Sequence, residues 1–94
     1  MIEERVGFKV QGKVQGVGYR MWVRSTAGAL GLRGSVRNLK DGSVELHVAG
    51  PPDAVATLER RLSQGPPGAR VTGVVRAFSR MPIPERGIQI EHTA

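Results

Sequence analysis

The stretch KVQGVGYR, residues 13–20, combines residue types that could bind an anion. Gly16 and Gly18 precede Arg20 at the point where an apolar alternating segment gives way to helical spacing. A helix leaves its first four backbone N–H groups without internal partners, and Ser, Thr, Asp or Asn usually accepts one of them. No such residue stands here, and Arg20 and Arg24 add positive charge near the positive end of the helix dipole.

An anion bound at this point would account for both features. Glycines let backbone amides converge on it, the helix N-terminus attracts it, and the Arg20 guanidinium can bind two of its oxygens. These residues alone leave an alternative open, in which Gly18 caps an ordinary strand-to-helix turn and Arg20 is simply solvated.

The remaining residue types exclude several kinds of chemistry. The 94 residues contain no cysteine, so the chain has no thiol nucleophile, disulfide or thiolate metal site. The eight acidic residues are scattered, without a His, Asp and Glu set at the spacing of metal ligands. We interpret His47 and His92 as solvated surface residues. We therefore expect no metal, no cofactor and no general acid.

The net charge of +6, carried mostly by arginine, suits an anionic partner or serves solubility alone. No apolar run approaches the roughly 20 residues of a membrane span. The first residues, MIEERVGF, lack the features of a secretory signal. We expect a cytoplasmic protein without membrane contact.

The elements that must position these residues follow from hydrophobic spacing. Alternation predicts strands over residues 5–14, 34–38, 43–50 and 69–79 and a short last strand over 88–92. Helical spacing predicts helices over 19–31 and 51–65, each ending at a glycine. Asp41-Gly42 predicts a hairpin turn. Two helices on one face of an antiparallel sheet give an α+β, two-layer ferredoxin-like (split βαβ) sandwich.

The motifs GKVQGVGYR and LGLRGSVRNLKDGSVE, followed by QGPPGARV, resemble the acylphosphatase family over nearly the whole chain. The resemblance implies a ferredoxin-like fold, one acylphosphatase-like domain over residues 1–94, and hydrolysis of the carboxyl–phosphate anhydride of small acyl phosphates. Such a leaving group needs no acid catalyst, because its carboxyl pKa is about 4. This agrees with the expected absence of a general acid.

The resemblance also implies a role for particular residues. Arg20 and the loop amides would hold the phosphoryl group, and Asn38 would orient the attacking water. The loop residues implied are Gln15, Gly16, Val17, Gly18, Tyr19 and Arg20, with Gly12 as the preceding family glycine. Inorganic phosphate or sulfate is expected to occupy the same site, and the protein is expected to be a monomer. Ser35 and Ile88 depart from the family's usual aromatic residues, which bears on substrate preference rather than on reaction type.

Two other functions remain as alternatives, both without turnover. An RNA-binding sheet would need exposed aromatic residues, but the open face is expected to show Gly7, Lys9 and Gln11 beside Glu45 and His47. A carrier of a phosphorylated ligand would resemble the amino-terminal domain of hydrogenase-maturation carbamoyltransferases. That longer protein has zinc-finger spacing, so the absence of cysteine favours a stand-alone enzyme.

Overall fold

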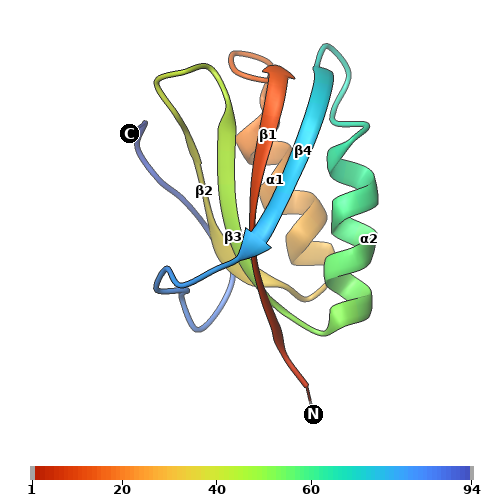
Figure 1. Ribbon diagram of the computed structural model, residues 1–94, viewed down its shortest axis with the longest axis vertical. Helices are drawn as coiled ribbons and strands as arrows, with labels where there is room; N and C mark the ends of the chain where they lie inside the picture. Colours follow the sequence, from red (N-terminus) through yellow and green to blue (C-terminus); the bar gives the residue numbers. More distant parts are fainter. Residues whose placement is uncertain (1, 94) are drawn as a thin grey trace.

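The computed structural model describes residues 2–93 as a five-stranded sheet with both helices on one face (Figure 1). The strands lie in the order β4-β1-β3-β2-β5. The elements are β1 (Glu4–Lys13), α1 (Tyr19–Ala29), β2 (Arg33–Asn38), β3 (Val44–Gly50), α2 (Pro52–Leu62), β4 (Arg70–Phe78) and β5 (Ile88–Ile90). This arrangement confirms the predicted two-layer ferredoxin-like sandwich.

The core lies between the sheet and the helices. Successive residues of a strand point to opposite faces, so Phe8 of β1 and Leu46 of β3, which are directly opposed, turn toward the helices and are buried. Gly31, with a φ of 75°, follows the end of α1 as predicted. The helices contribute one buried stripe each: Tyr19, Val23 and Ala27 from α1, and Val55, Leu58 and Leu62 from α2.

The predicted antiparallel arrangement holds for the described strand pairs other than the pairing of β5. The pairs β1–β3, β1–β4 and β2–β3 are antiparallel, but β5 runs parallel to β2. The chain leaves β4 at the end of the sheet where β2 begins and passes in front of the lower part of the central strands, on the open face (Figure 1). It therefore enters the opposite edge in the same direction as β2. Ile88, one of the departures from the family, is buried there opposite Gly34.

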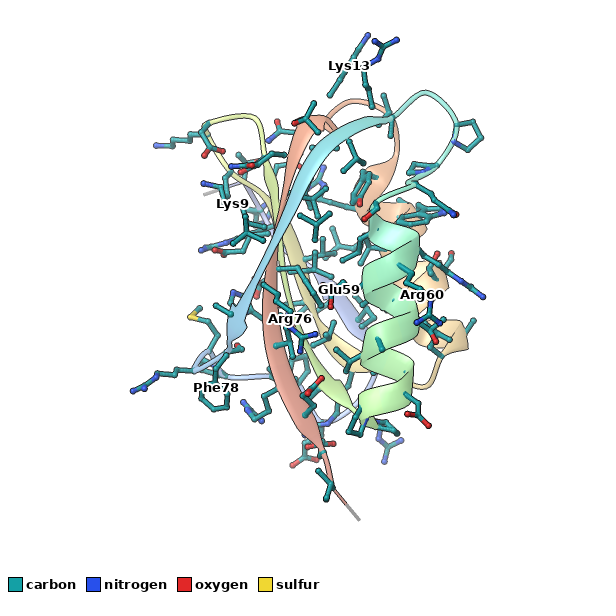
Figure 2. All side chains as sticks on the ribbon, turned by 45° about the vertical axis from the view of Figure 1, so that its right-hand side comes forward. Lys9, Lys13, Glu59, Arg60, Arg76 and Phe78 are labelled. Carbon is teal, nitrogen blue, oxygen red and sulfur yellow. The ribbon has the colours of Figure 1, made fainter. Side chains whose placement is uncertain are left out.

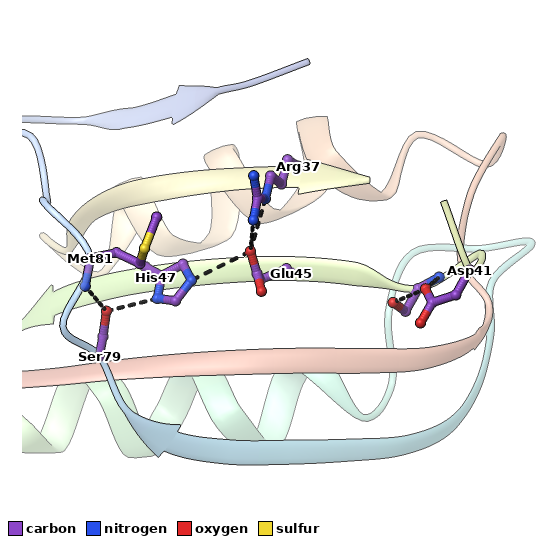
Figure 3. A network of polar contacts seen from close by, with 7 residues as sticks. Arg37, Asp41, Glu45, His47, Ser79 and Met81 are labelled. Atoms are coloured by element: carbon purple, nitrogen blue, oxygen red, sulfur yellow. Dashed lines mark hydrogen bonds and ion pairs between the residues drawn. The ribbon is translucent and has the colours of Figure 1, made fainter. Parts of the chain in front are cut away.

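A network of polar side chains covers part of the open face of the sheet (Figure 3). His47 Nδ1 lies 2.7 Å from Ser79 Oγ, which also accepts from the Met81 N–H, and His47 Nε2 lies 3.5 Å from Glu45. Glu45 pairs with Arg37 at 2.7 Å. His47 lies on the polar face of the sheet as predicted, but it is less solvated than expected, because its side chain is only 16% exposed. It anchors the segment that leads to β5.

The end of the sheet opposite this crossing gathers three connections. The loop after β1, the turn between β2 and β3, and the segment between α2 and β4 all lie at the upper end in Figure 1. Lys13 projects outward from this end (Figure 2). Within residues 2–93, no helix is long and apolar enough to cross a membrane.

Candidate active site

The loop between β1 and α1 brings backbone amides to the positive end of a helix. Gly16 and Gly18 have φ values of 75° and 77°, in the left-handed region that glycine adopts without strain. Gly18 is the N-cap of α1, no side chain caps the helix, and its first turn has no acidic residue. The residue types around Arg20 predicted this uncapped start, which leaves N–H groups and the helix dipole available to an anion.

A pocket of about 120 Å³ opens at this helix start. The structure brings Arg20 and Asn38 together there with the loop glycines, although they come from different elements. Pockets for drug-sized ligands measure roughly 300–1,000 Å³, so this one suits a small group with the rest of a ligand outside. The lining residues are Val14, Gly16, Gly18, Tyr19, Arg20, Met21 and Asn38.

Arg20 lines the pocket with part of its guanidinium already held. One terminal nitrogen, Nη1, donates to the main-chain oxygen of Glu91, 3.2 Å away and just beyond β5. A guanidinium has five N–H donors, so this bond fixes its direction and leaves others for an anion. This partner could not be read from the sequence, because a backbone carbonyl carries no residue-specific signal.

Asn38 is the last residue of β2 and lies opposite Val44. Its neighbour Arg37 belongs to the network on the open face, so alternation turns Asn38 toward the helix side and into the pocket. Its side-chain amide offers both a donor and an acceptor, which is what holding a water in one orientation requires. Ser35, three residues earlier, is buried opposite His47 and does not line the pocket.

Two predicted loop residues direct their side chains away from the pocket. The Gln15 side chain donates to the carbonyl oxygens of Leu39 and Ser43, at 2.7 and 2.8 Å, in the turn between β2 and β3. Val17 packs against the hydrophobic core. Only the main-chain amides of these two residues remain available for the predicted role.

Tyr19 lines the pocket and also connects it to the end of α2. The residue is 2% exposed, and its hydroxyl donates to the carbonyl oxygen of Leu62 at the end of α2, 2.8 Å away. Burial raises the pKa of this phenol well above its ordinary value, so the hydroxyl keeps its proton. The loop is thereby tied to the hairpin on one side and to α2 on the other.

Met21 is a pocket residue that the sequence motifs did not indicate. It is 51% exposed and stands next to Arg20 in the first turn of α1. An exposed methionine at the edge of the pocket provides an apolar surface for the part of a ligand that stays outside. Among the described residues, no three His, Cys, Asp or Glu side chains are grouped so that they could hold a metal ion.

The comparisons with known proteins show the family of this chain. The family model described as Acylphosphatase matches residues 6–90. An acylphosphatase of Mesorhizobium japonicum is 56% identical over 66 residues, which is 70% of this chain and 70% of that protein. An acylphosphatase structure from Coxiella burnetii superposes with a TM-score of 0.88 at 36% identity, covering 95% of this chain and 93% of that one. Another from Bacillus subtilis gives a TM-score of 0.81 at 30% identity, covering 99% of both chains.

Proposed function

Because this chain belongs to the acylphosphatase family and hydrolyses acyl phosphates, we propose that the pocket at the start of α1 is its active site. The proposal rests on one observation: Arg20, Asn38 and the glycine-rich loop line the same small pocket. The main-chain amides of residues 15–19 and the Arg20 guanidinium bind the phosphoryl oxygens. They neutralise the charge that a transferring phosphoryl group carries.

Asn38 orients the water that attacks phosphorus. A bond forms between the water oxygen and phosphorus, the bond between phosphorus and the bridging oxygen breaks, and its electron pair leaves with the carboxylate. The carboxylate is stable unprotonated, because its pKa is about 4, so no general acid is required. The proton of the water passes to a phosphoryl oxygen of the substrate. The products are a carboxylate and inorganic phosphate.

We propose further that the reaction needs neither metal nor cofactor, and that inorganic phosphate and sulfate compete for the pocket. The functional unit is a cytoplasmic monomer whose single domain spans residues 1–94. Equilibrium sedimentation checks the monomer, and inhibition by inorganic phosphate checks the competition. Binding without turnover is not favoured, since the curated relatives are acylphosphatases.

The test is hydrolysis of benzoyl phosphate, beside a phosphate monoester, with a chelator present. We expect the anhydride to be cleaved and the ester to be nearly untouched. Arg20→Gln lowers kcat and raises KM together, since it removes binding as well as charge stabilisation. Asn38→Ala chiefly lowers kcat, by about 100-fold or more, since it acts on the water. Normal kinetics in both variants would remove this pocket from the reaction.

A further inference from the structure

The side chain of Gln15 crosses from the loop after β1 to the turn between β2 and β3. Its amide nitrogen lies 2.7 Å from the Leu39 oxygen and 2.8 Å from the Ser43 oxygen. Both partners are carbonyl oxygens, which accept but cannot donate. The NH₂ group of the glutamine, and not its oxygen, must therefore face the turn.

The turn that receives Gln15 is itself closed by hydrogen bonds. The Leu39 N–H donates to the Ser43 oxygen at 2.9 Å, and the Gly42 N–H donates to the Leu39 oxygen at 3.1 Å. Each carbonyl thus accepts one bond from the turn and a second from Gln15. Leu39 directly follows Asn38, so Gln15 connects the loop to the residue next to the proposed water-orienting amide.

We propose that Gln15 is a positioning residue, which fixes the distance between the loop amides that bind the phosphoryl group and the side chain of Asn38. The inference rests on the proposed function of this pocket. A displacement of about 1 Å between reacting groups can cost on the order of 100-fold in rate. Loss of the Gln15 bonds should therefore lower kcat, while phosphate binding by the loop and Arg20 persists.

Two variants of Gln15 test this role by different chemistry. In Gln15→Met the length remains but the donor is lost, so kcat falls at every pH. In Gln15→Glu an ionised carboxylate would face two carbonyl oxygens, whereas the protonated acid donates one bond. Those oxygens favour the neutral form and raise the pKa of the new carboxyl above its ordinary value of about 4.3. Relative to wild type, kcat of Gln15→Glu should recover as the pH falls toward the raised pKa of this carboxyl and the neutral acid forms.

The control is Gln11→Glu, because Gln11 lies on β1 ahead of the loop, is exposed, and does not line the pocket. We expect unchanged kinetics there. For both Gln15 variants we expect kcat on benzoyl phosphate to fall roughly 10- to 100-fold. In Gln15→Met, which adds no charge to the loop, inhibition by inorganic phosphate should change by no more than about threefold, or roughly 0.6 kcal/mol. Thermal unfolding shows whether each variant is folded. If Gln15→Glu is not, kcat and phosphate inhibition of Gln15→Met decide the test.

Three outcomes would overturn the inference. These are wild-type kcat in the Gln15 variants, a pH profile of Gln15→Glu parallel to wild type, or an equal loss of phosphate binding and kcat in Gln15→Met. Arg20→Gln and Asn38→Ala are measured beside them. If those two behave as proposed and the Gln15 variants do not, only the positioning role fails. If those two retain wild-type kinetics, the proposed active site itself fails.

Discussion

Gly16 and Gly18 shape the loop between β1 and α1 through their backbone conformation. Gly16 and Gly18 have positive φ values, and a Cβ built on either meets no atom within 4 Å. An alanine would therefore fit in space but would be strained, at a cost of about 1–2 kcal/mol. We expect Gly16→Ala and Gly18→Ala to lose about this much stability in urea unfolding. They should also lose kcat/KM on benzoyl phosphate, because the loop amides turn away from the phosphoryl group.

Gly31 offers a matched control for these two substitutions. It has a φ of 75° and the same open space around a Cβ, but it follows the opposite end of α1 from the pocket. Gly31→Ala should lose similar stability and keep normal kinetics. An equal loss of activity in this variant would mean that the loop glycines act only through general stability.

Tyr19 is the residue that links pocket and core. Tyr19→Phe removes the hydroxyl that bonds the Leu62 oxygen, and we expect a loss of about 1–2 kcal/mol in the free energy of unfolding. Burial raises the pKa of this phenol, so above a pH of about 10 the unfolded chain releases a proton that the folded chain keeps. Stability should therefore fall as the pH rises beyond that point.

The chain has a single tyrosine, so the comparison of Tyr19→Phe with wild type isolates this effect. The difference in unfolding free energy should be constant below a pH of about 10 and shrink above it. It is measured by urea unfolding at several pH values. A difference that stays constant to high pH would contradict the assignment of a protonated, buried phenol.

Among the elements, the turn between β2 and β3 is held by its own polar contacts. Asp41, labelled in Figure 3, accepts hydrogen bonds from the hydroxyl and the N–H of Ser43. It also pairs with Lys9 at 2.9 Å. The hydrogen bonds from Ser43, aided by Lys9, hold the pKa of Asp41 well below its ordinary range. The unfolded chain takes up a proton near pH 4 that the folded chain does not, so this stabilisation is lost as the pH falls below about that value.

Asp41→Asn should therefore be less stable than wild type at neutral pH, by an amount that shrinks as the pH drops below about 4. Thermal unfolding across that range measures the difference. Lys9→Gln serves as the partial variant. It removes the ion pair and leaves the Ser43 bonds, so it should keep most of the pH dependence. A difference independent of pH would show that the Asp41 charge does not stabilise the turn.

The sequence patterns predict the helices and strands better than they predict the contacts between them. Alternation and helical spacing predict the strands and helices found in residues 2–93, and the lack of a capping side chain before Arg20 predicts an anion site at the start of α1. The parallel pairing of β5 was not predictable, because direction depends on where the crossing segment enters the sheet. The bonds of Gln15 and Tyr19 were not predictable either, since their carbonyl partners lie 24 to 43 residues away and have no residue-specific signature.

For the whole molecule, the distribution of positive charge is uneven. Arg76 of β4 pairs with Glu59 of α2 at 2.7 Å (Figure 2). It also pairs with Glu4 of β1 at 3.2 Å, and its guanidinium lies 5.8 Å from the centre of the Phe8 ring. Its charge is therefore locally balanced. The unbalanced positive charge lies elsewhere, and its position affects how an anionic substrate approaches.

Three exposed basic residues lie in or beside the segments that frame the pocket. Lys13 precedes the loop, Arg24 is one helical turn beyond Arg20, and Lys40 is in the turn after Asn38. The whole chain has a net charge of +6, and these three residues attract an acyl phosphate toward the pocket before it binds. Raising the salt from about 10 mM to about 1 M shortens the Debye length from about 30 Å to about 3 Å. We expect kcat/KM on benzoyl phosphate to fall roughly tenfold, with kcat nearly unchanged.

Competition by the salt anion would lower kcat/KM in the same way, so two salts are compared at equal ionic strength. Chloride is small enough to enter the pocket, whereas gluconate is bulkier and has no tetrahedral oxyanion group for the loop and Arg20 to bind. Screening acts equally in both, because it depends on ionic strength alone. Replacing Lys13, Arg24 and Lys40 together by glutamine should reduce the salt dependence, since the attraction it screens is then weaker. A salt effect confined to chloride, or unchanged in the triple variant, would mean that the substrate is recognised only after it reaches the loop.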